Sequence, residues 1–223
     1  MHRGLGRYVM AISFALFAAG GILPRGAASQ ESATPPAHRL EAAPATVERL
    51  YAALEQVASR GNDLGLEGRR LLLAPAVEAT LDLEFMAARV LGRHWRALES
   101  SEKKSWQELF TRLTVASYAE RFDSAEGLRF EVLDAKAGAR GTALVHSRIH
   151  PPDGEPVAVD YRLRPTRQGW RIIDVYLNGT VSELALRRSE YASVIDREGF
   201  EKLSQSLDAK IRSGEAAAHF PSS

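Results

Sequence analysis

The sequence predicts an α+β domain in which an antiparallel sheet of about four strands packs against N-terminal and C-terminal helices. Two observations carry this prediction. Residues 128–177 contain four short stretches of strand character, separated by turn residues. Helical patterns come before and after this region, whereas a doubly wound α/β fold would alternate helices with strands.

The clearest strand pattern lies in residues 155–179, which we interpret as a long hairpin. In its first half apolar side chains alternate with polar ones, and the apolar set is Val157, Val159, Tyr161 and Leu163. Successive side chains of a strand face opposite sides of the sheet, so this strand has one apolar face. Turn residues at 165–169 precede a second strand, Trp170 to Leu177, which ends at Asn178-Gly179.

Two earlier strands complete the sheet. Phe130 and Val132 alternate with charged residues in the first, and the second runs from Thr142 to Ile149. We interpret residues 138–141 as a hairpin turn, because no strand-to-helix context surrounds them as a phosphate-binding loop requires. Four consecutive strands joined by short turns predict an antiparallel meander.

Apolar residues at three- and four-residue spacing predict six helices around the sheet. Their expected ranges are 46–60, 66–79, 82–92, 100–122, 182–197 and 200–211. Pro75 is expected to mark a start or a kink in the second of these helices. In the third, Asp82 is the expected N-cap and Gly92 the expected C-terminal stop. The longest of them, 100–122, is expected to be the main cover of the sheet.

The N-terminus has the features of a cleaved secretory signal over residues 1–29. Arg3 and Arg7 precede an apolar stretch, Tyr8 to Ala19, and small residues around Ala28 offer a cleavage site. An uncleaved anchor is the alternative, although the apolar stretch is shorter than the about 20 residues that a membrane span needs. The chain has no cysteine, which excludes a lipoprotein anchor. We expect a flexible leader over residues 30–44, a folded domain over 45–212 and a disordered tail over 213–223.

The charge balance gives no support for a nucleic-acid partner. The whole chain carries 29 basic and 28 acidic side chains. The predicted signal contains three arginines and no acid, so the remaining chain has 26 basic and 28 acidic side chains. A nearly neutral domain lacks the excess of positive charge that binding to phosphate backbones requires.

Motif searches favour no enzyme class. The chain has no Gly-x-Ser-x-Gly elbow, and without cysteine it has no thiol chemistry. His146 and His150 are four apart on a predicted strand, which separates them by roughly 13 Å and does not suit a shared metal ion. His94 follows a helix end, where a histidine has an ordinary structural role. We therefore expect no metal site.

Asp160 and Asp174 are the one candidate pair of catalytic carboxylates. They could pair across the hairpin as acid and base on a cone-shaped α+β scaffold. The structural alternative is that Asp160 makes a surface ion pair and that Asp174 bonds an arginine or a backbone group. The sequence favours this alternative. Asn178-Gly179-Thr180 also matches a glycosylation acceptor, but we interpret it as a turn.

Six arginines form the one concentration of charge in the C-terminal half. They are Arg162, Arg164, Arg167, Arg171, Arg187 and Arg188. They are either a solvated face or a patch for an anionic headgroup or an acidic partner.

Several short motifs, in their order and spacing, resemble the MlaC/toluene-tolerance family of periplasmic lipid-binding proteins. The first is a helix that begins at an aspartate and ends in Val90-Leu91-Gly92, with Trp95 after it. The second is the strand segment Val159 to Arg162, and the third is Gly169-Trp170-Arg171 at the start of the last strand. The fourth is Arg188-Ser189-x-Tyr191 in the following helix. The resemblance runs from about Thr46 to Ile211. Residues 121–127 and 178–182 are more similar to the hopanoid-biosynthesis-associated branch of that family.

This resemblance implies a curved sheet backed by helices, an enclosed apolar cavity and no catalysis. It implies a lipid cargo, phospholipid or hopanoid, carried between an inner-membrane ABC transporter complex and an outer-membrane lipoprotein complex, with no other cofactor. The residues expected to line the cavity are Phe110, Leu113, Tyr118, Phe130, Val132, Val145, Val157, Val159, Tyr161, Leu163, Ile173 and Val175. Two alternatives remain open from the residues alone: an enzyme that uses Asp160 or Asp174, and an interaction or scaffold protein in which these apolar residues form a solid core.

Overall fold

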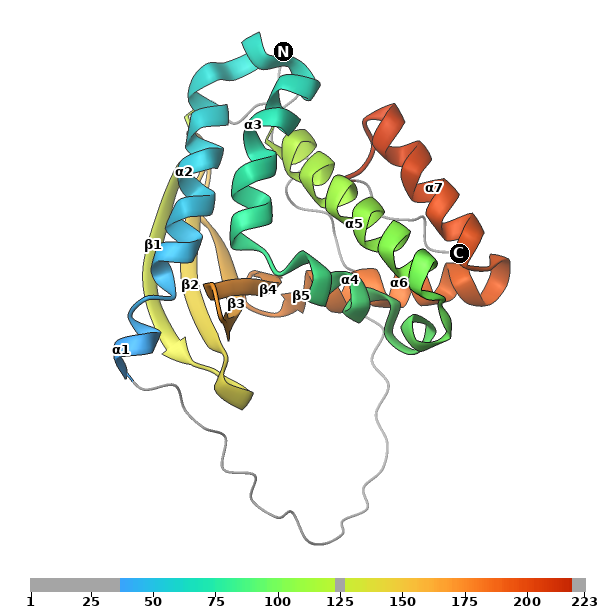
Figure 1. Cartoon of the computed structure of the whole chain (residues 1–223). Coiled ribbons are helices and arrows are strands. Elements are labelled where there is room, and N and C mark those ends of the chain that lie inside the picture. Colours follow the sequence, from blue (N-terminus) through green and yellow to red (C-terminus); the bar gives the residue numbers. More distant parts are fainter. Residues whose placement is uncertain (1–36, 123–126, 218–223) are drawn as a thin grey trace, which may run out of the picture. The chain divides into compact units, whose positions relative to one another are not determined.

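The computed structural model describes residues 37–122 and 127–217, which belong to one compact unit of residues 33–223. Helices come first, the sheet follows, and two further helices end the described chain (Figure 1). The helices are α1 (Ala37–Leu40), α2 (Pro44–Arg60), α3 (Gly65–Thr80), α4 (Leu83–Leu91), α5 (Ser100–Arg121), α6 (Glu183–Glu198) and α7 (Phe200–Ser213). The strands are β1 (Arg129–Ala137), β2 (Ala143–His150), β3 (Val157–Thr166), β4 (Gly169–Leu177) and β5 (Val181–Ser182). This order confirms the predicted α+β class.

The strands form one antiparallel sheet in the order β1-β2-β3-β4-β5, which confirms the predicted meander. β5 was not predicted, because a two-residue strand is too short to show an alternating pattern. The register shifts at two bulges, one between Val132 and Asp134 in β1 and one where β4 passes Arg162 and Leu163 of β3. Bulges bend a strand and increase its twist, which accounts for the curved sheet in Figure 1.

α2, rather than the longest helix, lies against the sheet. It packs on β1 and β4, and its inward face is a row of buried residues, Val47, Leu50, Leu54 and Val57. The prediction that residues 100–122 would be the main cover is wrong, because α5 packs mainly on α3, α4 and α7. Helical periodicity shows that a helix has an apolar face, but it does not show which element covers that face.

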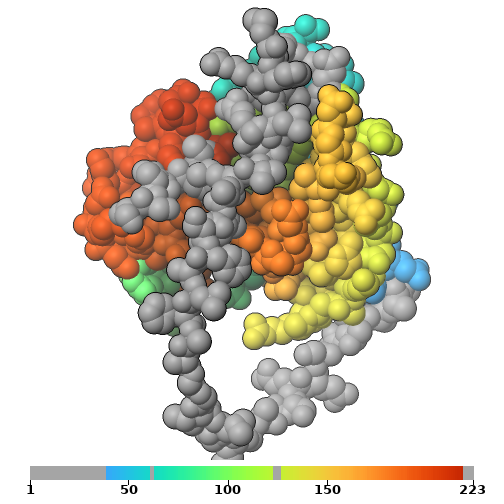
Figure 2. Space-filling view, turned by 180° about the vertical axis from the view of Figure 1, so that it is seen from behind, coloured from blue at the N-terminus to red at the C-terminus, as the bar shows by residue number. Residues whose placement is uncertain are grey.

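α5 organises a second apolar layer among the helices. Trp106 of α5 is almost fully buried and donates its indole N–H to the carbonyl of Ala87 in α4 at 2.9 Å. Its ring lies 5.8 Å from the Tyr191 ring of α6 and 5.7 Å from the Phe200 ring of α7. Four helices therefore meet at one aromatic centre. Figure 2 shows from behind that the C-terminal helices, in red, and the first two strands, in yellow, lie on different sides of the folded unit.

α3 continues through a proline. It runs from Gly65 to Thr80 with Pro75 inside it, so this proline does not mark the start of the helix. Leu73 and Val77 on either side are fully buried. Their burial offsets the backbone hydrogen bond that a proline removes from a helix.

Both predicted ends of α4 are confirmed. Asp82 Oδ1 accepts a hydrogen bond from the backbone N–H of Phe85 at 3.2 Å, and Gly92 ends the helix with a φ of 55°. The second carboxylate oxygen of Asp82 pairs with Arg164 Nε at 2.5 Å. The backbone N–H of Asp82 also donates to the carbonyl of Ile172 at 2.8 Å. One residue therefore caps α4 and fixes it to β3 and β4.

The folded part of the chain begins before residue 45 and continues beyond residue 212. Trp170 Nε1 donates to the carbonyl of Arg39 at 2.5 Å, and Ser117 Oγ donates to the carbonyl of Ala216 at 2.8 Å. Ala43 and Ala216 are buried. The predicted signal, residues 1–29, and residues 218–223 lie outside the described residues. Among the helices of residues 37–122 and 127–217, none combines the length and the apolar composition that crossing a membrane requires.

Replacing Asp82 with alanine is expected to lower the free energy of unfolding by about 2 kcal/mol. The variant loses the N-cap of α4 and leaves Arg164 without its carboxylate. Urea denaturation followed by circular dichroism measures the change. Glu84→Ala, which is exposed in the same helical turn, is the control and should stay within about 0.5 kcal/mol of the parent. An Asp82→Ala protein as stable as the parent would contradict this account of the α4 cap.

Candidate functional site

The four long strands share one continuous inner face. The register places Tyr161 opposite Val145 and Val175, and Leu163 opposite Ala143 and Ile172. The next row along the same face contains Val132, Ser147, Val159 and Leu177. The row after it contains Phe130, Ile149 and Val157. Because side chains alternate along each strand, these rows form a single surface that is apolar except for Ser147 and the Tyr161 hydroxyl.

This face is sealed at one end and accessible at the other. At the end nearest the β3–β4 turn, Ala143, Val145, Leu163 and Ile172 are completely buried. At the opposite end the apolar side chains stay partly accessible, and they are Phe130, Val132, Ile149, Val157, Val175 and Leu177. Phe130, Ile149 and Val157 are neighbours in one row, whereas Val132 and Leu177 stand at the two ends of the next row, whose centre, Ser147 and Val159, is buried.

The junction of α3 and α4 closes the sealed end. Leu81 pairs with Ile172 in a short parallel bridge, and Thr80 and Leu81 are both buried. Thr46 at the start of α2 donates to the carbonyl of Trp170 at 3.1 Å from the other side. Backbone and side-chain hydrogen bonds therefore hold three helices against this end of β4.

Aromatic side chains stand around the accessible end. Phe122, just after α5, lies 5.9 Å from Phe130 and stacks on Tyr118 at 6.3 Å, measured between ring centroids. Burial raises the pKa of Tyr118 to about 12, so protein atoms rather than bulk water surround its hydroxyl. Part of the Tyr118 side chain nevertheless remains accessible. Tyr118 therefore has a buried hydroxyl and a partly accessible side chain, and it packs on Phe122 at this end of the sheet.

The polar groups of the inner face have protein partners. The Tyr51 hydroxyl bonds Ser147 Oγ at 2.5 Å, and Ser147 in turn donates to the carbonyl of Val159. Burial raises the pKa of Tyr51 and raises that of Tyr161 well above its ordinary value. The hydroxyls therefore remain neutral in the physiological range and add no charge to the apolar face.

The predicted lining residues fall into three groups. Tyr118, Phe130, Val132, Val157 and Val175 are partly accessible, whereas Val145, Val159, Tyr161 and Leu163 are buried positions of the inner face. Phe110 and Leu113 are buried in the helical layer, and Ile173 is buried at the β4 bulge outside the main core cluster. Sequence reasoning missed Ile149 and Leu177, although both continue the alternation of their own strands.

Asp160 and Asp174 do not form an acid–base pair. The register places Asp160 opposite Tyr176, and Asp174 opposite Arg162. Asp160 Oδ1 lies 3.0 Å from His146 Nδ1, and the two side chains form an ion pair when the histidine is protonated. Within residues 37–122 and 127–217, no three His, Cys, Asp or Glu side chains gather in a way that could hold a metal ion.

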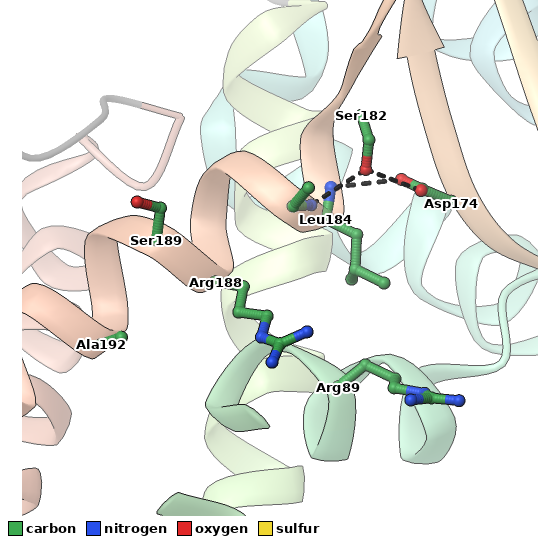
Figure 3. Close-up of a pocket in the computed structure, with 8 residues that line it drawn as sticks. Arg89, Asp174, Ser182, Leu184, Arg188, Ser189 and Ala192 are labelled. Carbon is green, nitrogen blue, oxygen red and sulfur yellow. Dashed lines mark hydrogen bonds between the residues drawn. The ribbon is translucent and has the colours of Figure 1, made fainter. Parts of the chain in front are cut away.

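The carboxylate of Asp174 is fully used by local hydrogen bonds. It is 8% exposed, and Ser182 Oγ donates to Oδ2 at 2.7 Å. Oδ1 accepts from the backbone N–H groups of Val175 at 2.9 Å and of Leu184 at 3.2 Å. Figure 3 shows Ser182 and Leu184 beside this carboxylate at the start of α6. Asp174 therefore fixes β4, β5 and α6 together, in agreement with the structural alternative.

The six C-terminal arginines do not form one patch. Arg164 pairs with Asp82, and Arg171 donates to the carbonyl of Glu78 at 2.7 Å. Arg187 hydrogen-bonds Tyr191, whereas its neighbour Arg188 lines a pocket between α4 and α6. Arg162 lies over the ring of Tyr176, and Arg167 is exposed in the β3–β4 turn.

Comparison with protein families identifies this architecture. A family model described as MlaC protein matches residues 45–209. The chain belongs to the MlaC family. No curated protein matches the sequence.

A solved structure supports the fold of this MlaC-family protein. The phospholipid-binding protein from Ralstonia solanacearum, determined in complex with a phospholipid, superposes with a TM-score of 0.67 at 24% sequence identity. The match covers 77% of this chain and 98% of that one. Nearly the whole of that protein is therefore reproduced here as the same arrangement of helices and sheet.

Substitution of Asp174 separates a structural role from a catalytic one. We expect Asp174→Ala to lower the free energy of unfolding by about 3 kcal/mol, because two backbone N–H groups and one hydroxyl lose a charged acceptor. Asp174→Asn keeps one acceptor oxygen and should cost about half as much. Thermal and urea unfolding measure the change in the free energy of unfolding. Asp160→Asn, at a more exposed position, is the control, and its free energy of unfolding should stay within about 1 kcal/mol of the parent. Full stability of both Asp174 variants would contradict the structural role.

Proposed function

We propose that this protein is a non-enzymatic lipid carrier whose cargo chain lies against the accessible end of the inner face. One observation carries the proposal: the apolar row Phe130, Ile149 and Val157 on the inner face stays partly accessible, beside the aromatic pair Phe122 and Tyr118. Membership of the MlaC family and the phospholipid complex of the similar structure support the same assignment.

The physical reason for such a surface is the cost of exposing hydrocarbon. Each CH₂ group in contact with water costs about 0.8 kcal/mol, so a chain of about fifteen such groups costs roughly 12 kcal/mol. A lipid therefore needs an apolar container to leave a bilayer. Val157, Val175 and Phe130 offer apolar surface of the right chemistry, and Phe122, which contacts Phe130, and Tyr118 add aromatic surface beside it.

The finer assignment concerns location and partners. A cleaved signal at residues 1–29 would place the carrier in the periplasm. There it would take lipid to or from an inner-membrane ABC transporter complex and an outer-membrane lipoprotein complex. A phospholipid is the favoured cargo, and a hopanoid is the alternative that the similarity of residues 121–127 and 178–182 to the hopanoid-associated branch suggests. No nucleic acid and no cofactor other than the cargo is part of this proposal.

The enzyme alternative has weaker support. It would need a carboxylate that is available to a substrate, but Asp174 accepts three hydrogen bonds and Asp160 faces His146. Both aspartates also lie on positions that alternate with the inner-face residues Val159, Tyr161 and Val175.

Filling the accessible end tests the proposal. Protein purified without detergent is expected to carry a lipid that native mass spectrometry detects. Val157→Trp places an indole on the inner face and should lower the bound fraction at least about fivefold, because the added ring competes with the cargo for the same volume. Ala158→Trp is the matched control, since the adjacent residue faces the opposite side of β3.

Two results would count against the proposal. One is a lipid-free protein that also takes up no phospholipid or hopanoid from vesicles. The other is an unchanged bound fraction in Val157→Trp, with circular dichroism showing that the variant is folded.

A further inference from the structure

A second concave site lies away from the inner face, between α4 and α6. It is a pocket of about 410 Å³ whose walls include Arg89 from α4 and Leu184, Arg188 and Ser189 from α6. Figure 3 shows the side chains of Arg89 and Arg188 in this pocket, with Asp174 and Ser182 at its other side. The pocket shares no lining residue with the inner face, and Asp174 on its wall alternates along β4 with Val175 of that face.

The two guanidinium groups are positioned by neighbouring residues. The Arg89 guanidinium lies over the Phe85 ring at 4.9 Å, one turn earlier in α4. The Arg188 side chain lies against Gly92, and a Cβ added at Gly92 would come within 2.7 Å of Arg188 Nε. The absence of a side chain at the end of α4 therefore makes room for the Arg188 guanidinium beside the pocket.

The positive charge in this pocket has little compensation. In the described part of the chain, neither Arg89 nor Arg188 forms an ion pair, whereas nearby Arg93 pairs with Asp196 and Arg164 with Asp82. Asp174 is the carboxylate on the pocket wall, but it accepts from Ser182 and from two backbone N–H groups. Both arginines are exposed, so each brings an uncompensated positive charge to the wall of the pocket that an anion can reach from solvent.

We propose that the α4–α6 pocket binds the phosphate group of an organic phosphate. Guanidinium groups match phosphate oxygens in a two-bond geometry, and Ser189 adds a hydroxyl at the same wall. The pocket is larger than a bare ion, and Leu184 with two alanines gives it an apolar side for the organic part of the ligand. The phosphate comes either from a free phosphate ester or from a phospholipid headgroup presented at a membrane surface. This site is independent of the proposed cargo site.

The test uses the purified protein with sn-glycerol 3-phosphate and, separately, with vesicles of phosphatidylglycerol. Isothermal titration gives the affinity, and amide chemical shifts locate the site. We expect binding of at least one of the two probes, with shifts at Arg89, Arg188 and Ser189. The double variant Arg89→Gln/Arg188→Gln should weaken that binding about a hundredfold, or about tenfold for each lost charged contact.

The controls decide between a built site and general attraction of anions. Arg148→Gln/Arg167→Gln removes two exposed positive charges from the sheet and its turn, and it should leave the affinity unchanged. Binding of glycerol phosphate identifies a free ester as a sufficient ligand, whereas binding of vesicles alone identifies the lipid headgroup as the source. The proposal is overturned if neither probe binds, if the Arg89→Gln/Arg188→Gln protein binds as tightly as the parent, or if the control variant loses as much. The lipid content of the same preparations, measured separately, reports on the cargo site and not on this pocket.

Discussion

The buried carboxylate of Asp174 is the interaction on which the functional half of the molecule depends. It accepts hydrogen bonds from Val175 and Leu184 and from the Ser182 hydroxyl, so β4, β5 and the start of α6 are fixed at one point. α6 leaves the sheet from this point. From there α6 contributes Tyr191 to the aromatic centre around Trp106 and Arg188 to the α4–α6 pocket. A carboxylate that fulfils this role is not available for chemistry.

The second constraint is the uneven closure of the inner face. Leu81, Ile172 and Leu163 are buried because the α3–α4 junction and the start of α2 are hydrogen-bonded to β4 at that end. Val157 and Val175, toward the other end, keep partly accessible apolar area. Protein interiors normally pack to the density of organic crystals. The proposed cargo chain would complete this packing at the accessible end of the inner face.

Much of the fold could be predicted because its signals are local. The alternation in residues 157–163 predicted a strand with one apolar face, and Asp82 and Gly92 predicted the ends of α4 from capping chemistry alone. The cover of the sheet could not be predicted in this way, since α2 and α5 both have apolar faces and only tertiary packing shows that α2 contacts β1 and β4. β5 was too short to be predicted, and Asp174 showed its role only when Ser182 and Leu184 were placed beside it.

The candidate site shows the same division between local and tertiary information. Periodicity placed Val145 and Val157 on one face, but it could not show that the first is sealed and the second accessible. That difference depends on helices distant in sequence. Arg187 and Arg188 are neighbours in sequence and were grouped together. The helix directs them to different sides, one to Tyr191 and the other to the α4–α6 pocket.

The most direct test of the central claim is to locate the cargo chain on the sheet. A photoreactive amino acid is placed at Val157 on the inner face and, in a separate protein, at His146 on the opposite face of the adjacent strand. Both proteins are irradiated as purified, and mass spectrometry detects any cross-linked lipid. The account predicts an acyl chain attached at position 157 and none at 146. Cross-linking at 146 with none at 157, in proteins that carry lipid, would contradict it.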